Sequence, residues 1–168
     1  MSQRKIISDY IESLLKAEII NRCPLCGRFE GTSDKFTNHH INFDNSISEY
    51  WNLIRICRKC HDDITKNKED GKRLRKIKQI KKDLFRRFIG DASFQVLLMA
   101  NHHKVTSTLP CLAMSLLKLE LVQINYNNPL TVGSAKHPTI TDLKITSKGK
   151  EFIKELNISE DIIDIPLI

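Results

Sequence analysis

Four cysteines in the first half of the chain have the spacing of metal ligands. Cys23 and Cys26 form one Cys-x2-Cys pair, and Cys57 and Cys60 form a second. Two such pairs supply four thiolates from two tight turns, which is the ligand set of a tetrahedral structural zinc site. The N-terminal residues lack the apolar block of a secretory signal, so we expect a cytoplasmic protein whose paired cysteines bind Zn²⁺ rather than form disulfides.

The loop between the two cysteine pairs is long enough to hold a further element. Thirty residues separate Cys26 from Cys57, whereas roughly 15 to 20 are usual between such pairs. The loop contains His39-His40-Ile41 and Asn52-Leu53-Ile54, and His61 directly follows Cys60. Taken alone, histidines beside cysteines are more often ordinary surface or core residues than ligands. Their order along the chain gives them a more specific interpretation.

This order resembles the His-Asn-His signature of the HNH endonucleases, in the subgroup whose ββα-metal fold is braced by a four-cysteine zinc. The resemblance covers about residues 22–68 and includes Cys57-Arg58-Lys59-Cys60-His61 as well as the two segments above. Asn52 lies twelve positions after His40, and His61 lies nine positions after Asn52. The resemblance implies hydrolysis of DNA phosphodiester bonds to 5′-phosphate and 3′-hydroxyl ends.

The resemblance also implies a role for each site residue. His40 would be the general base, since imidazole has an unperturbed pKa of about 6.5 and can accept a proton from water. His39 and His61 would hold one catalytic divalent metal, and Asn52 would fix the His40 strand by bonding backbone groups. Many relatives have Asp where this chain has His39, so the metal could be Mg²⁺, Mn²⁺, Ni²⁺ or Zn²⁺. Adjacent strand residues point to opposite faces, so we expect a distortion at His39-His40.

Hydrophobic periodicity predicts the elements around these residues. A one-sided helix is expected over residues 4–20, strands near residues 37–42 and 52–57, and a helix that begins at about residue 60 and continues to residue 88. Residues 58–87 carry 13 basic and 5 acidic residues. Beside a nuclease site, such a run can grip the DNA backbone, and the nearest candidates in the sequence are Arg55, Lys59 and Lys66.

Charge divides the chain into two halves. The net charge is +7, yet residues 1–90 carry 20 basic and 12 acidic residues, whereas residues 91–168 carry 7 and 8. We therefore expect a nuclease domain over residues 1–90 that binds DNA, and an accessory domain over residues 91–168 that can recruit residues 82–90. The longest uncharged run, residues 121–135, contains Asn, Pro and Gly and is too short to span a membrane.

The second half resembles a winged helix. Helices are expected over residues 93–101, 108–119 and 147–156, and strands over residues 121–126 and 139–145 around a polar tip. The middle helix has one basic residue in twelve, so we expect a homodimer or partner-protein contact. DNA recognition through this domain is the alternative, which Lys136 and His137 at the tip leave open. Cys111 is expected to be a small buried residue, and His102-His103 an ordinary helix end.

Together these features predict an α+β fold, with a zinc-braced ββα-metal module flanked by helices and a small winged-helix-like domain. The leading function is that of a metal-dependent endonuclease, and analogy suggests a bacterial defence or restriction nuclease. The alternative is a non-catalytic, zinc-containing winged-helix protein that binds nucleic acid or regulates transcription.

Overall fold

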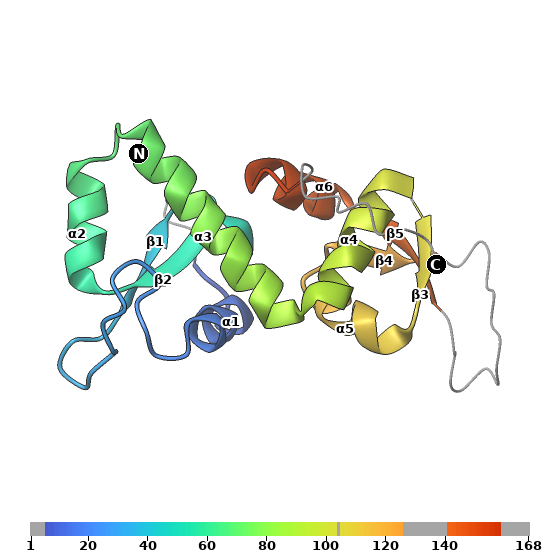
Figure 1. Cartoon of the computed structure of the whole chain (residues 1–168), viewed down its shortest axis with the longest axis horizontal. Helices are drawn as coiled ribbons and strands as arrows, with labels where there is room; N and C mark the ends of the chain where they lie inside the picture. Colours follow the sequence, from blue (N-terminus) through green and yellow to red (C-terminus); the bar gives the residue numbers. More distant parts are fainter. Residues whose placement is uncertain (1–5, 104, 126–140, 159–168) are drawn as a thin grey trace. The chain divides into compact units, whose positions relative to one another are not determined.

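The computed structural model describes residues 6–103, 105–125 and 141–158. Within these residues the fold is mixed α and β, as predicted, with six α-helices and two small antiparallel sheets (Figure 1). The chain separates into two compact units, residues 1–88 and 89–168. This division falls two residues before the expected boundary at Gly90-Asp91, where the charge of the sequence changes.

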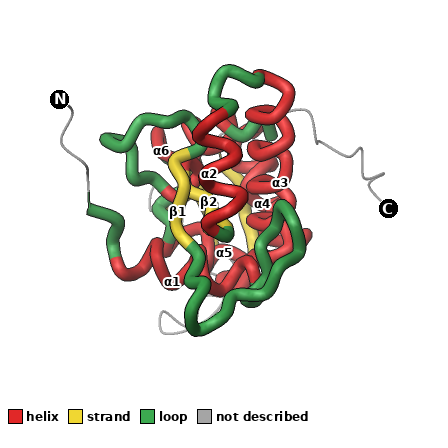
Figure 2. Tube along the Cα trace, turned by 90° about the vertical axis from the view of Figure 1, so that its left-hand side faces the viewer, coloured by secondary structure: helices red, strands yellow, loops and turns green. Residues whose placement is uncertain are grey.

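The first unit is built around a short hairpin. Its elements are α1 (Asp9–Ile19), β1 (Thr37–His40), the 3₁₀ turn η1 (Tyr50–Asn52), β2 (Leu53–Ile56), α2 (Arg58–Lys66) and α3 (Gly71–Ile89). Strands β1 and β2 pair antiparallel, with His39 opposite Ile54 and His40 opposite Leu53. Both strands lie where the sequence predicted them, and α2 lies beside β1 (Figure 2).

The helix expected from about residue 60 to residue 88 is in fact two helices, so that prediction was wrong. Helix α2 ends where the N–H of Asn67 bonds the carbonyl of Ile64 at 3.1 Å. The carboxylate of Asp70 then accepts from the backbone N–H groups of Lys72 and Arg73 and caps the start of α3. Local side-chain capping therefore interrupts an apolar stripe that would otherwise continue.

The core of the first unit joins α1, the hairpin, α2 and α3. Helix α1 begins after Ser8, whose hydroxyl accepts from the N–H of Ile11 at 3.3 Å. The buried cluster is apolar and includes two of the cysteines; its members are Ile19, Cys23, Phe36, Ile41, Ile54, Ile56, Cys57, Ile64, Ile77 and Leu84. All four residues of β2 are buried, so the side chains on both faces of this strand are covered by other parts of the unit.

A buried ion pair also lies within this unit. The Lys81 side chain on α3 is fully buried, and its Nζ donates to Glu18 Oε1 of α1 at 2.8 Å. The hydroxyl of Tyr50 donates to the same carboxylate, and Lys81 Nζ lies 3.4 Å from the centre of the Tyr50 ring. Burial lowers the pKa of Lys81 to about 8, although the Glu18 carboxylate opposes this shift. The trio therefore connects α1, η1 and α3 at one point.

The second unit packs helices on a three-stranded sheet. Its elements are α4 (Asp91–His103), β3 (Val105–Thr108), α5 (Pro110–Lys118), β4 (Val122–Ile124), β5 (Thr141–Ile145) and α6 (Ser147–Glu155), and the sheet order is β3-β5-β4. Strand β3 was not predicted. Thr146 caps α6 by accepting from the N–H of Gly149 at 2.9 Å, and a Cβ at Gly149 would lie 2.1 Å from the Leu121 carbonyl oxygen. Only glycine permits this approach of α6.

Three further expectations for this unit have different outcomes. Cys111 is exposed rather than buried, because α5 turns Ala113 and Leu116 into the core instead. Helix α4 does end at His103, as expected. Lys136 and His137 lie outside the described residues. Among the helices that the structure describes, none combines the length and the apolar character needed to cross a membrane.

The buried pair gives a stability prediction. Glu18→Ala leaves the Lys81 ammonium buried without its carboxylate, which should lower the free energy of unfolding by about 3–5 kcal/mol. Urea denaturation followed by circular dichroism measures the change. Lys16→Ala is the matched control, because the Lys16–Glu12 pair on α1 is exposed and should contribute less than about 1 kcal/mol. Equal effects of the two substitutions would show that the buried pair does not stabilise the unit.

Candidate metal centre and active site

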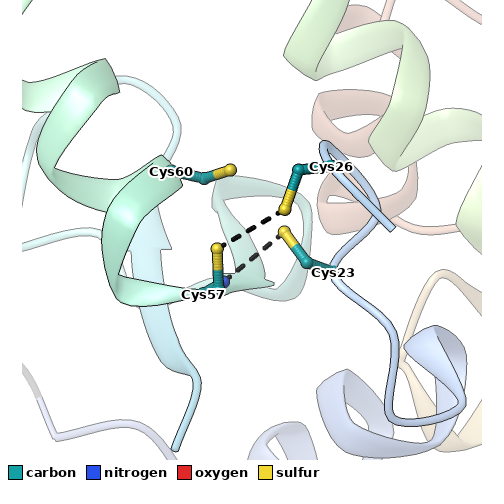
Figure 3. A group of neighbouring side chains, drawn as sticks. All are labelled: Cys23, Cys26, Cys57 and Cys60. Carbon is teal, nitrogen blue, oxygen red and sulfur yellow. Dashed lines mark hydrogen bonds between the residues drawn. The ribbon is translucent and has the colours of Figure 1, made fainter. Parts of the chain in front are cut away.

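The four cysteines predicted to bind zinc come together in space. Their Sγ atoms all lie within 4.8 Å of one another, and those of Cys26 and Cys57 are 3.6 Å apart (Figure 3). A tetrahedral zinc with Zn–S distances of about 2.3 Å requires sulfurs about 3.8 Å apart. The donor set and the spacing therefore fit a structural metal such as zinc.

The first cysteine pair is shaped by a tight turn after α1. The Cys23 carbonyl accepts from the N–H of Gly27 at 2.8 Å, and the Cys23 N–H donates to the Arg28 carbonyl at 2.8 Å. Gly27 has φ of +73°, a conformation that a side chain would strain. The turn directs Cys23 and Cys26 toward the second pair.

The second pair is positioned by the start of α2. Cys57 is the N-cap of α2, so Cys60 occupies the first helical turn. The backbone N–H of Cys57 also lies 3.5 Å from Cys23 Sγ, within hydrogen-bonding range for sulfur. The cluster thus joins the end of β2 to the turn after α1.

The thiols differ in how readily they ionise. The backbone N–H of Arg28 is the main cause that lowers the pKa of Cys26 to about 7. Burial raises the pKa of Cys57 and Cys60. A bound cation would supply the positive charge that the buried thiolates lack, and binding would release their protons.

The three histidines of the predicted signature line one cavity, which we call the histidine cavity. It has a volume of about 430 Å³, and its walls also include Thr37, Asn38, Phe43, Asn45 and Thr65. His39 comes from β1 and His61 from α2, and their ring centres lie 5.1 Å apart, edge to face. Because His61 directly follows Cys60, the cysteine cluster fixes the end of α2 that carries it.

His39 has the state expected of a metal ligand. The residue is 4% exposed, and its Nε2 is buried with no hydrogen-bond partner among the described residues. Burial is the main cause that lowers the pKa of His39 to about 4, and the neighbouring His61 and His40 lower it further. The imidazole is therefore neutral at neutral pH, with a lone pair available. A cation at Nε2 would satisfy an atom that is otherwise costly to bury.

His39 and His40 both line the histidine cavity at the end of β1. The two residues pair in regular register with Ile54 and Leu53 of β2, so the register shows no distortion between them. A turn follows directly, in which the carbonyl of His40 accepts from the N–H of Phe43 at 3.0 Å. Phe43 has φ of 61°, a left-handed conformation.

Asn52 has the structural position that the resemblance implied. The side chain is fully buried, and its Oδ1 accepts from the N–H of Asn42 at 2.9 Å. Its Nδ2 donates to the Ile47 carbonyl at 2.8 Å, and its own carbonyl accepts from the Ile41 N–H at 2.7 Å. Asn52 therefore holds the turn that follows His40.

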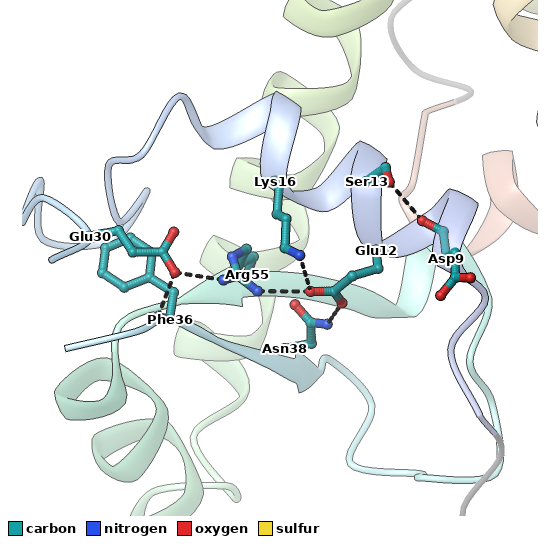
Figure 4. Close-up of polar contacts among 8 residues, drawn as sticks. All are labelled: Asp9, Glu12, Ser13, Lys16, Glu30, Phe36, Asn38 and Arg55. Carbon is teal, nitrogen blue, oxygen red and sulfur yellow. Dashed lines mark hydrogen bonds and ion pairs between the residues drawn. The ribbon is translucent and has the colours of Figure 1, made fainter. Parts of the chain in front are cut away.

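Arg55 was predicted to contact the DNA backbone, and the structure corrects this. Its side chain is 9% exposed and lies between two carboxylates, Glu12 Oε1 at 3.1 Å and Glu30 Oε1 at 2.6 Å (Figure 4). Glu12 also accepts from the Asn38 side chain. Arg55 thus links α1, the loop before β1 and the hairpin, and its charge is already neutralised.

The other two candidates remain on the surface. Lys59 and Lys66 are exposed on α2 and line an open hollow together with Arg28 and Arg58. Arg58 was not predicted as a site residue. The signal for it was its position three residues before His61, which places both side chains on one face of α2.

Comparison with protein-family models, with curated proteins and with solved structures finds no match. The case for a function therefore rests on the residues of the site and their geometry.

The cysteine cluster gives the second prediction. Cys57→Ser should abolish stoichiometric zinc and lower the melting temperature of the first unit, because metal binding supplies much of the folding free energy of such modules. Zinc content by mass spectrometry and thermal denaturation measure both effects. Cys111→Ser changes an exposed cysteine of the second unit and should change neither. Unaltered zinc content in Cys57→Ser would overturn the four-cysteine site.

Proposed function

We propose that the chain is a metal-dependent endonuclease of the HNH type that hydrolyses DNA to 5′-phosphate and 3′-hydroxyl ends. The observation that carries this proposal is the meeting of His39, His40 and His61 in one cavity beside the cysteine cluster. The order of β1, β2 and α2 supports a ββα-metal module. Asn52, with its bonds to the turn after His40, supports the same interpretation.

The chemistry follows from the positions of the three imidazoles. His39 and His61 would hold a divalent cation, which supplies Lewis-acid stabilisation of the charge that develops on the phosphate. His40, at the end of β1, would accept the proton of the attacking water. The two imidazole ligands favour Mn²⁺, Ni²⁺ or Zn²⁺ over Mg²⁺.

Exposed basic residues support DNA as the substrate. Lys59 and Lys66 lie on the same helix as His61 and are exposed. Cations at this position can bind phosphates on either side of the cleaved bond, which supplies affinity without sequence preference. Such a nuclease would act in the cytoplasm, and a bacterial defence or restriction role fits this reaction.

The second unit supports a proposal of its own. The sheet order β3-β5-β4 with three helices is in keeping with a winged-helix-like domain. Leu109, at the start of α5, and Met114 are 51% and 52% exposed, whereas Lys118 is the one basic residue of that helix. These features favour contact with a second copy or a partner protein over contact with DNA.

The alternative is a non-catalytic, zinc-containing regulator that binds nucleic acid. The cysteine cluster favours it, because such a cluster would brace a binding module equally well. The two functions differ in the histidines, which a regulator does not require.

The third prediction tests the proposed base. Wild type should cut supercoiled plasmid with Mn²⁺, Ni²⁺ or Mg²⁺ and not with EDTA. His40→Ala should lower the rate by about 10²- to 10⁴-fold, the usual contribution of a general base. The zinc content of the variant should match wild type. Plasmid forms are followed by gel electrophoresis.

His102→Ala is the matched control, because His102 lies in the last turn of α4 in the second unit and is not part of the histidine cavity. It should cut at the wild-type rate. Cleavage by His40→Ala at the wild-type rate would contradict the assignment, and sequence-specific binding without any cleavage would favour the regulator.

A further inference from the structure

A second hollow adjoins the histidine cavity, and we call it the loop hollow. It has a volume of about 470 Å³ and lies between the start of α2 and the loop before β1. It shares Thr37 and His61 with the histidine cavity. A molecule bound at His61 can therefore extend directly into it.

The loop hollow continues into a third space on the same unit. That space shares Asp34, Arg58 and Asp62 with the loop hollow and adds Lys59 and Lys66. The three spaces are therefore neighbours in series, which share wall residues from the histidine cavity, past Arg58, to the exposed lysines of α2. A series of this kind suits an extended ligand.

The charged residues that line these spaces differ in whether they have an ion-pair partner. Two of the acidic residues have cationic partners: Asp34 lies 3.2 Å from Arg28, and Asp63 lies 2.7 Å from Arg73. Asp62 lies 3.6 Å from Nδ1 of His61. Lys35 and Arg58 line the loop hollow, and within the described part of the chain neither has a carboxylate within ion-pair distance.

The side chains of the loop hollow match a phosphate group. Arg58 offers a planar fork of donors that binds phosphate oxygens in pairs, and Lys35 offers a compact charge. The hydroxyls of Thr32 and Ser33 line the same space and can donate further hydrogen bonds.

We infer that Lys35 and Arg58 bind the backbone phosphate adjacent to the one that is cleaved. This inference rests on the proposed function. It adds the path of the bound DNA strand, which would lead from the histidine cavity through the loop hollow toward Lys59 and Lys66. Lys35 and Arg58 are positioning residues, since contacts to a neighbouring phosphate hold the reacting phosphate in register.

The fourth prediction tests this subsite with the double variant Lys35→Ala/Arg58→Ala. The control is Lys68→Ala/Lys72→Ala, which removes one exposed charge before α3 and one in its first turn, outside the loop hollow. Binding of the zinc-loaded protein to a short fluorescent DNA duplex is measured by anisotropy, without added divalent cation, over a range of salt concentrations. The slope of log K against log salt should fall by about 0.9 for each phosphate contact that is lost. It should fall less in the control.

Cleavage of the same duplex gives an independent readout. The double variant should raise KM by about 10- to 100-fold, as expected for the loss of charge-assisted hydrogen bonds, and should also lower kcat, because a phosphate held out of register reacts more slowly. A rise in KM with kcat unchanged would mean a loss of uniform binding and would overturn the positioning role. Binding and KM equal to those of the control would overturn the subsite while leaving the nuclease intact. Absence of both binding and cleavage in wild type would overturn the subsite and the proposed function together.

Discussion

The four-cysteine cluster is the constraint on which the candidate site depends. It joins the turn after α1 to the start of α2 and so closes the segment that carries His39, His40 and Asn52. The β1–β2 hairpin inside this segment has four residues in each strand, and a hairpin of that size is marginal by itself. A metal at the cysteines would offset the entropy of closing the loop, and the position of His61 next to Cys60 lets the same cluster place His61 beside His39.

Buried ion pairs hold the rest of the first unit around this clamp. Arg55 of β2 lies between Glu12 and Glu30, and Lys81 of α3 pairs with Glu18 of α1 beside Tyr50 of η1. Burying a charge is costly, so such pairs contribute to a defined arrangement more than to net stability. They remove cations and carboxylates from the surface together, so the basic excess of the sequence is not reduced by them.

The sequence predicted the features that depend on local chemistry. Paired cysteines and the two strands follow from residue type and spacing, and the bonding role of Asn52 follows from the family resemblance. The break between α2 and α3 comes from local capping by Asp70, which the hydrophobic stripe does not reveal. Strand β3 and the exposed Cys111 depend on which surfaces find a partner in the folded unit, and a periodic pattern does not specify that. Arg55 was misassigned for the same reason: its partners Glu12 and Glu30 are distant in sequence.

An imidazole rather than a carboxylate at position 39 also affects how strongly the site would attract an anionic substrate. No acidic residue is among those lining the histidine cavity, and neutral His39 adds no negative charge. A divalent cation bound there would keep its full charge toward the phosphate, whereas a carboxylate ligand would offset part of it. Neutral ligands would bind a hard cation more weakly than carboxylates do. A phosphate oxygen of the substrate could supply a further ligand and so strengthen metal binding. Metal and DNA would then each raise the affinity for the other, and the cations of the loop hollow would add to the same coupling.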